Sequence, residues 1–116
     1  MINRFSCAAM VALSLTGCAS DPAPTEQLRL TEQALTQAKA VGADEQVAEL
    51  AMAEAKLQQA LSAMQGNAFK EARMLAEQAE LDARLAEAQV LTQKSQDQLN
   101  ELNNQINRLR KQLGEL

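Results

Sequence analysis

Apolar residues recur at helical spacing in three successive stretches of the chain. In the first stretch, Leu28, Leu35 and Ala38 share one face of a predicted helix. The second stripe consists of Val47, Leu50, Leu57, Leu61 and Met64, with Ala51 and Ala55 beside it and Glu54 interrupting it. The third stretch begins at Ala68 and contains no proline or glycine before Gly114. The pattern therefore predicts an all-α protein with three helices.

The residues between these stretches carry helix stop and start signals. Gly42 and Gly66 are predicted to follow the last residue of the first and second helices, in the left-handed position that glycine favours. Thr25, Asp44 and Asn67 are the predicted N-caps of the three helices. Because the connection at residues 66–67 is so short, the second and third helices must lie antiparallel.

The predicted helices differ greatly in length. Residues 44–65 make a helix of about 33 Å, whereas residues 68–114 make one of about 70 Å. Only the first half of the long helix can therefore pack on its own chain. The residues predicted to make that contact are Phe69, Ala72, Ala76, Ala79, Ala83, Ala86 and Val90. The second half needs another partner or stands in water.

A second apolar stripe runs along the end of the long helix. Alternating spacings of three and four, typical of the a and d positions of a coiled coil, join Leu99, Leu102, Ile106, Leu109, Leu113 and Leu116. Continued backward, this seam passes Ser95, Thr92, Ala88, Leu85 and Leu81. We expect residues 91–116 to form a coiled-coil extension, between copies of this chain or with another helix. The alternative is a frayed amphipathic tail, because fewer than three heptads are marginal.

The N-terminal residues have the pattern of a bacterial lipoprotein signal. Met1 to Arg4 form a positive segment, and an apolar run over residues 5–15 is too short to span a bilayer. Leu15-Thr16-Gly17-Cys18 then places a cysteine directly after two small residues. We expect lipidation of Cys18 by a diacylglyceryl and an N-acyl group, with residues 1–17 removed. In the alternative, an ordinary secretory signal, Cys18 is a free thiol.

Composition narrows the chemistry that this chain can perform. It contains no His, Trp or Tyr, and removal of residues 1–17 takes away Cys7 and Phe5. Residues 1–17 contain one of the 11 basic residues, Arg4, and none of the 15 acidic residues. Their removal therefore changes the net charge from −4 to −5. Histidine-based nucleophilic sites and histidine metal sites are therefore excluded, and an acidic surface repels nucleic acid.

Carboxylates are plentiful on the long helix, but their spacing favours ion pairs over a metal or acid–base site. Glu80 and Arg84 stand four residues apart, as do Arg73 and Glu77. Pairs at this spacing form on a solvated helix face. We expect no catalytic residue, no metal site, no cofactor beyond the lipid and no small-molecule substrate, and hence a protein that is not an enzyme.

Several motifs together resemble a known family. They are Val41-Gly42-Ala43, Ala53-Glu54-Ala55-Lys56-Leu57, Gly66-Asn67-Ala68-Phe69, residues 71–80 (EARMLAEQAE) and residues 82–86 (DARLA). The chain over residues 28–89 is similar to the DUF4398 family of envelope lipoproteins of Gram-negative bacteria. Some members add a peptidoglycan-binding domain, whereas this chain continues into the seam. The resemblance implies a helical envelope protein without known catalytic residues.

These observations predict four segments. They are a lipoprotein signal peptide at residues 1–17, a lipid-anchored tether at 18–24, an antiparallel three-helix region at 25–90 and a coiled-coil extension at 91–116. Because Ala19 and Ser20 follow the cysteine, we expect the periplasmic face of the outer membrane. The predicted role is a structural spacer or scaffold. The alternative is an adaptor that recognises an envelope protein or peptide through the surface of the helical bundle.

Overall fold

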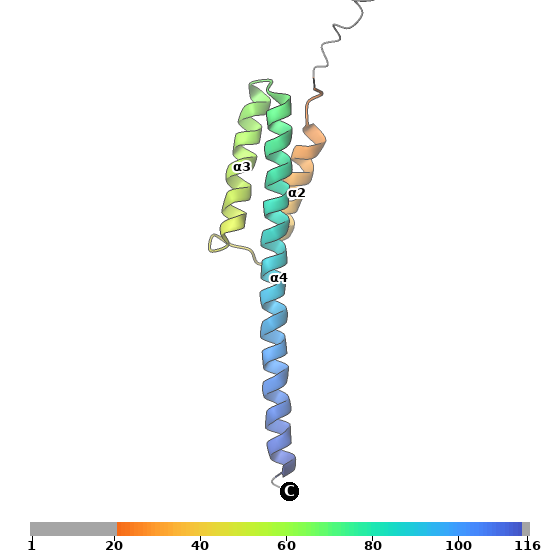
Figure 1. The fold of residues 1–116 in the computed structure, drawn as a ribbon, viewed down its shortest axis with the longest axis vertical. Helices are drawn as coiled ribbons and strands as arrows, with labels where there is room; N and C mark the ends of the chain where they lie inside the picture. The colour runs from red at the N-terminus through yellow and green to blue at the C-terminus, as the bar shows by residue number, and fades with distance from the viewer. Residues whose placement is uncertain (1–20, 115–116) are drawn as a thin grey trace, which may run out of the picture.

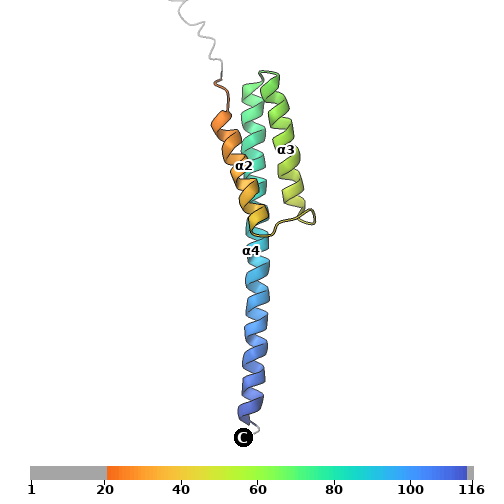
Figure 2. The ribbon, with the colours of Figure 1, turned by 180° about the vertical axis from the view of Figure 1, so that it is seen from behind.

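The structure is a computed structural model and describes residues 21–114. Three helices follow one another in the chain: α2 (Thr25–Ala40), α3 (Ala48–Gln65) and α4 (Phe69–Gly114). Helix α2 runs alongside the first half of α4 in the same direction, and α3 runs antiparallel to both (Figure 1). The view from behind shows the lower half of α4 projecting beyond both shorter helices (Figure 2). The predicted all-α architecture with a long C-terminal helix is confirmed.

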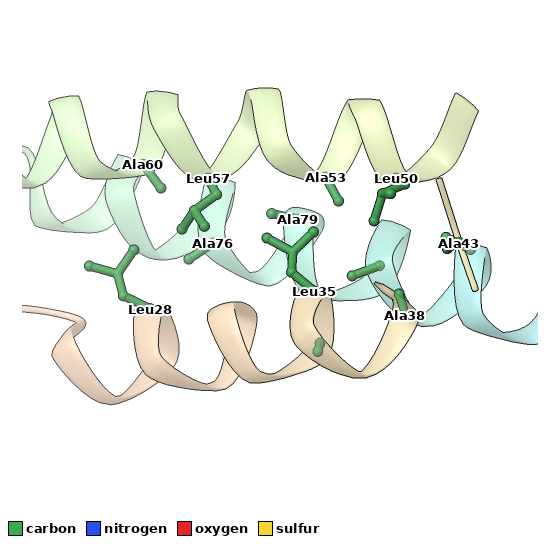
Figure 3. Close-up of a cluster of buried hydrophobic side chains, with 13 residues drawn as sticks. Leu28, Leu35, Ala38, Ala43, Leu50, Ala53, Leu57, Ala60, Ala76 and Ala79 are labelled. Carbon is green, nitrogen blue, oxygen red and sulfur yellow. The ribbon is translucent and has the colours of Figure 1, made fainter. Parts of the chain in front are cut away.

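The core is built from leucines of two helices against alanines of the third. Figure 3 shows Leu28 and Leu35 of α2 and Leu50 and Leu57 of α3 between the helices, near the alanines of α4. Each leucine is followed three residues later by a small buried residue, so both short helices repeat a large–small pattern. These small residues are Thr31, Ala38, Ala53 and Ala60. On α4, the buried residues are Ala72, Ala76, Ala79, Ala83 and Ala86, each with no exposed surface. The small side chains let the helices approach closely.

On α3 the buried alanines differ from those predicted. Ala53 and Ala60 are buried, whereas Ala51 and Ala55 are exposed. Alanine fits both a core and a solvated position, so the spacing of the leucines alone sets the direction of the buried face. Glu54, which interrupts the predicted stripe, is exposed and pairs with Lys39 of α2 at 2.6 Å between Nζ and Oε1.

Both connections end a helix with the same hydrogen-bonded turn. After α2, Gly42 N–H donates to the Lys39 carbonyl and Ala43 N–H to the Ala38 carbonyl, each at 2.9 Å. These two bonds define a Schellman motif, and Gly42 takes the left-handed position that it requires, at φ 103°. The prediction for Gly42 agrees with this geometry.

After α3 the prediction is wrong by one residue. Asn67 N–H donates to the Met64 carbonyl and Ala68 N–H to the Ala63 carbonyl, and Asn67 is the residue with positive φ, at 58°. Gly66 has φ −79°, which any residue can adopt. The Ala68 carbonyl accepts the first hydrogen bond of α4, from Ala72 N–H at 2.9 Å. Asn67 therefore completes the end of α3, and Ala68 is the N-cap of α4.

The other two predicted N-caps also lie elsewhere. Helix α2 already includes Thr25, because the Pro24 carbonyl accepts its first hydrogen bond, from Leu28 N–H at 3.0 Å. An N-cap at Asp44 would place the first residue of α3 at Glu45. The helix begins three residues later, at Ala48, and Val47 is its N-cap. The Asp44 carboxylate instead accepts from the Gln46 backbone N–H at 2.9 Å, which stabilises the turn between α2 and α3.

Candidate functional site

Helix α4 has two different long faces. Its inner face, the alanines from Ala72 to Ala86, packs against α2 and α3. The opposite face, here called the outer face, consists of the a and d positions between Met74 and Leu113. Its members are Met74, Gln78, Leu81, Leu85, Ala88, Thr92, Ser95, Leu99, Leu102, Ile106, Leu109 and Leu113. At 3.5 residues per turn, the two faces lie about 150° apart around the helix.

Every residue of the outer face is exposed. Among its large apolar side chains, Ile106 exposes 45% of its surface, Leu81 66% and Leu113 72%. Four of the five seam residues predicted within the free half of α4 are more than half exposed, with Ile106 slightly below. Their pairing with another helix therefore stays a prediction. Met74 lies seven residues before Leu81 at the same heptad position, so it extends the outer face toward the start of α4. The apolar pattern of the sequence did not reveal this extension, because Gln78 interrupts it.

The bundle ends at Val90 and Lys94. Val90 is the last residue of α4 that packs against the core. Lys94 donates from Nζ to the Val41 carbonyl at 2.7 Å, next to the Gly42 turn. All residues from Leu91 to Gly114 are exposed. At 1.5 Å per residue, the free part of α4 is about 36 Å long.

Polar contacts hold α2 and α3 on α4. The buried Thr31 hydroxyl of α2 lies 2.9 Å from both the Ala76 carbonyl of α4 and the Gln27 carbonyl of its own helix. Lys56 of α3 pairs with Asp82 of α4 at 2.5 Å between Nζ and Oδ2. These contacts fix which side of α4 is covered, so that the outer face stays open.

Glu80 is the most connected carboxylate among the described residues. Arg84 donates to its Oε1 from Nη2 at 2.6 Å and from Nε at 2.9 Å, and Gln27 donates to Oε2 at 2.7 Å. The hydrogen bonds from Arg84, followed by that from Gln27, hold the pKa of the Glu80 carboxyl below its ordinary value. Through its bond to Gln27, Glu80 links α4 to α2.

The other predicted ion pair is replaced by a contact with the start of the described chain. Arg73 donates from Nη2 to the Pro22 carbonyl at 3.2 Å.

Near the turn between α3 and α4, a shallow hollow of about 1040 Å³ is lined by Asp21, Phe69, Met74 and neighbouring residues. Within residues 21–114, no group of three Cys, Asp or Glu side chains is arranged to hold a metal ion. None of the helices in this part of the chain is long and apolar enough to cross a membrane.

Comparison with known proteins identifies the family. Residues 26–102 match a domain of unknown function designated DUF4398. This chain belongs to the DUF4398 family. A crystal structure of a DUF4398 family protein from Pseudomonas aeruginosa PAO1 is 67% identical in sequence. It superposes with a TM-score of 0.79 and covers 81% of this chain and 98% of its own. No curated protein matches this DUF4398 chain.

The family match covers α2 except for its first residue, all of α3 and most of α4. The predicted resemblance is thereby confirmed, and the match extends past the predicted residues 28–89 into the free part of α4. The family description names no substrate, ligand or partner.

Proposed function

We propose that this protein is a lipid-anchored structural spacer on the periplasmic face of the outer membrane. The observation that carries the proposal is the position of the chain start relative to α4. Pro22 contacts Arg73 in the first two turns of α4, at the same end as the turn between α3 and α4 (Figure 1). Cys18 lies three residues before Asp21 in the sequence, so it is within about 11 Å of it in any conformation.

An anchor at that end orients the molecule. Helix α4 begins near the anchor and continues for 46 residues, about 69 Å, so its C-terminal end is the part of the described chain farthest from the lipid. Two or three acyl chains hold a protein at a bilayer far more firmly than a single chain does, at about 0.8 kcal/mol for each buried methylene. A short tether and a rigid helix are the parts that a spacer needs.

The side-chain chemistry agrees with a structural role. The chain has no histidine, and its most strongly hydrogen-bonded carboxylate, Glu80, is used in holding α2 on α4. Lys56 and Asp82 likewise join α3 to α4. We therefore propose a structural protein rather than an enzyme, lipidated on Cys18.

The anchor is tested by cell fractionation and by metabolic labelling with palmitate. We expect the Cys18→Ser variant to lose the label and to leave the outer membrane, either as released protein or as unprocessed precursor. The matched control is Cys7→Ser, which lies within the predicted signal peptide and should retain both label and location. A Cys18→Ser protein that is processed and still fractionates with outer membranes contradicts the proposal.

The spacer role is tested by energy transfer to the membrane. Purified lipidated protein carrying Gln65→Cys or Gln112→Cys is labelled and inserted into phosphatidylethanolamine–phosphatidylglycerol vesicles that contain an acceptor lipid. Gln65 lies at the anchored end and Gln112 near the far end of α4, and both are exposed. We expect strong transfer from position 65 and weak transfer from position 112. Equal transfer from both would mean that α4 lies flat on the bilayer, which contradicts a spacer.

A further inference from the structure

We infer that the outer face of α4 is a self-association surface along its whole length, and that it binds a second copy of this chain in parallel. The parallel orientation rests on the proposed lipid anchor, which holds both copies by the same end. The surface begins at Met74, beside the bundle, and ends at Leu113. It is therefore much longer than the seam in the free part of α4.

The distribution of charge along α4 supports a continuous contact surface. Between Met74 and Leu113 there are 11 charged residues, and none of them occupies any of the 12 positions of the outer face. A helix face that simply met solvent would have no reason to exclude charge over 40 residues. Nine of its 12 positions carry apolar side chains, and soluble proteins seldom leave so many uncovered along one face.

The area of the outer face decides between a local and an extended contact. From Met74 to Leu113 it is about 58 Å long, and at a helix-contact width of about 10 Å it offers roughly 600 Å² to a partner. The part from Leu99 to Leu113 alone offers roughly 200 Å². A standard stable interface buries about 800 Å² on each partner. Only the full length approaches this value, and anchoring in one membrane raises the effective concentration of the two copies.

The bundle leaves room for a parallel partner. Because α2 and α3 cover the inner side of α4, two copies can join their outer faces while their bundles point away from each other (Figures 1 and 2). In-register pairing places Thr92 against Thr92 and Ser95 against Ser95, and polar layers of this kind fix the register of a coiled coil. A shift of one heptad would set Thr92 against Leu85 or Leu99, and Ser95 against Ala88 or Leu102.

Charges beside the outer face permit the same register. Parallel pairing brings together one pair of like charges between the flanking positions, Glu77 and Asp82 of the second copy. Asp82 is already paired with Lys56 of its own α3 at 2.5 Å. This contact within each subunit opposes the repulsion.

Disulfide crosslinking in cells that express the full chain tests the inference. Ala88→Cys places a thiol on the outer face within the bundle section, and Leu109→Cys places one in the free part of α4. The matched control is Ala55→Cys, an equally small exposed position on α3. After mild oxidation we expect disulfide-linked dimers for Ala88→Cys and Leu109→Cys, and monomers for Ala55→Cys and for the parent.

A second variant tests whether the bundle section contributes to binding. Adding Leu81→Gln and Leu85→Gln to the Ala88→Cys protein should reduce the dimer at least about tenfold, because two apolar layers are lost. Both leucines are largely exposed in the single chain, at 66% and 49%. The fold of the subunit should therefore be unaffected, which circular dichroism of the purified variant checks.

Several outcomes would overturn the inference. Dimers of Leu109→Cys without dimers of Ala88→Cys would confine the contact to the free part of α4. Crosslinking of Ala88→Cys only to a co-expressed Leu99→Cys variant would show antiparallel pairing, because an inverted copy places these positions opposite each other. Equal dimer yields at Ala88 and Ala55 would indicate random collision. An absence of dimers at both outer-face positions would mean that the partner is a different protein or that there is none.

Fractionation of the same cells separates failure of this inference from failure of the lipid anchor. Protein that pellets with membranes but gives no outer-face dimer leaves the anchor in place and refutes self-association. Parent protein that is soluble, or that forms a disulfide through Cys18, refutes the anchor, because a cysteine sulfur that carries a diacylglyceryl thioether cannot form a disulfide. Ala88→Cys dimers in that soluble protein would still support the extended surface and would refute membrane anchoring as the reason for parallel pairing.

Discussion

The same substitution is expected to have opposite effects at the two glycines that follow α2 and α3. Gly42 has φ 103°, a backbone conformation that L-residues rarely adopt, whereas Gly66 has φ −79°. A Cβ at Gly66 would meet only the Ala63 and Ser62 carbonyl oxygens, at ordinary contact distances of 3.6 and 3.7 Å. Gly66→Ala therefore costs nothing in the folded state and restricts the unfolded chain.

The expected magnitudes follow from these conformations. Left-handed backbone costs an L-residue about 1–2 kcal/mol, so Gly42→Ala should destabilise the bundle by that amount. A Cβ at Gly42 would also lie 3.5 Å from Lys94 Nζ, which donates to the Val41 carbonyl. Gly66→Ala should stabilise by about 0.4–1 kcal/mol through the entropy of the unfolded state. At about 4–8 °C per kcal/mol, the two melting temperatures should differ by roughly 6–24 °C.

Thermal unfolding followed by far-ultraviolet circular dichroism measures this difference. Parent and variants are compared at equal, low protein concentration so that self-association does not contribute to the melting temperature. A melting temperature of Gly66→Ala that falls as far as that of Gly42→Ala would refute the reasoning. Gly66 would then occupy the left-handed position at the end of α3, and the assignment of that position to Asn67 would be wrong.

Two further predictions concern the contacts of α4. Ala79 has no exposed surface, so Ala79→Leu should destabilise the bundle by about 1–3 kcal/mol in chemical denaturation. The control Ala55→Leu lies at an exposed position and should change stability by less than about 0.5 kcal/mol. Glu80→Gln should cost at most about 1 kcal/mol at pH 7. Because hydrogen bonds lower the Glu80 pKa in the folded state, that stabilisation is present above the unfolded pKa of about 4.3 and is lost as the pH falls through the folded pKa. The stability difference between parent and Glu80→Gln should therefore shrink below about pH 4, and a difference that grows there would contradict the assigned interaction.

The helices and the open face of α4 could be predicted from the sequence because large apolar residues mark them. Leu28 and Leu35, Leu50 and Leu57 define one direction on each short helix, and all four are buried. The free half of α4 follows from its length, since neither of the two shorter helices is long enough to reach it. Both predictions rest on hydrophobic spacing and helix length, so an error of one or two residues at a helix end does not change them.

Details that depend on residues with two suitable conformations could not be predicted. Glycine and asparagine both accept positive φ, so the pair Gly66-Asn67 does not reveal which of them ends α3. Asp44 can cap a helix or a turn with the same carboxylate, and here it caps the turn. Ala51 and Ala53 are equally suited to core and surface, and only the packed structure distinguishes them.

The alanine-rich core has a consequence for the heat capacity of unfolding. Ten of the 14 apolar residues buried in the bundle are alanines, so unfolding exposes little apolar area for each residue released. The heat-capacity change grows with exposed apolar area and is reduced by the polar backbone exposed at the same time. Its value should be small for a chain of this length, and stability should vary gently with temperature. Such a flat profile keeps the bundle folded across large changes in temperature.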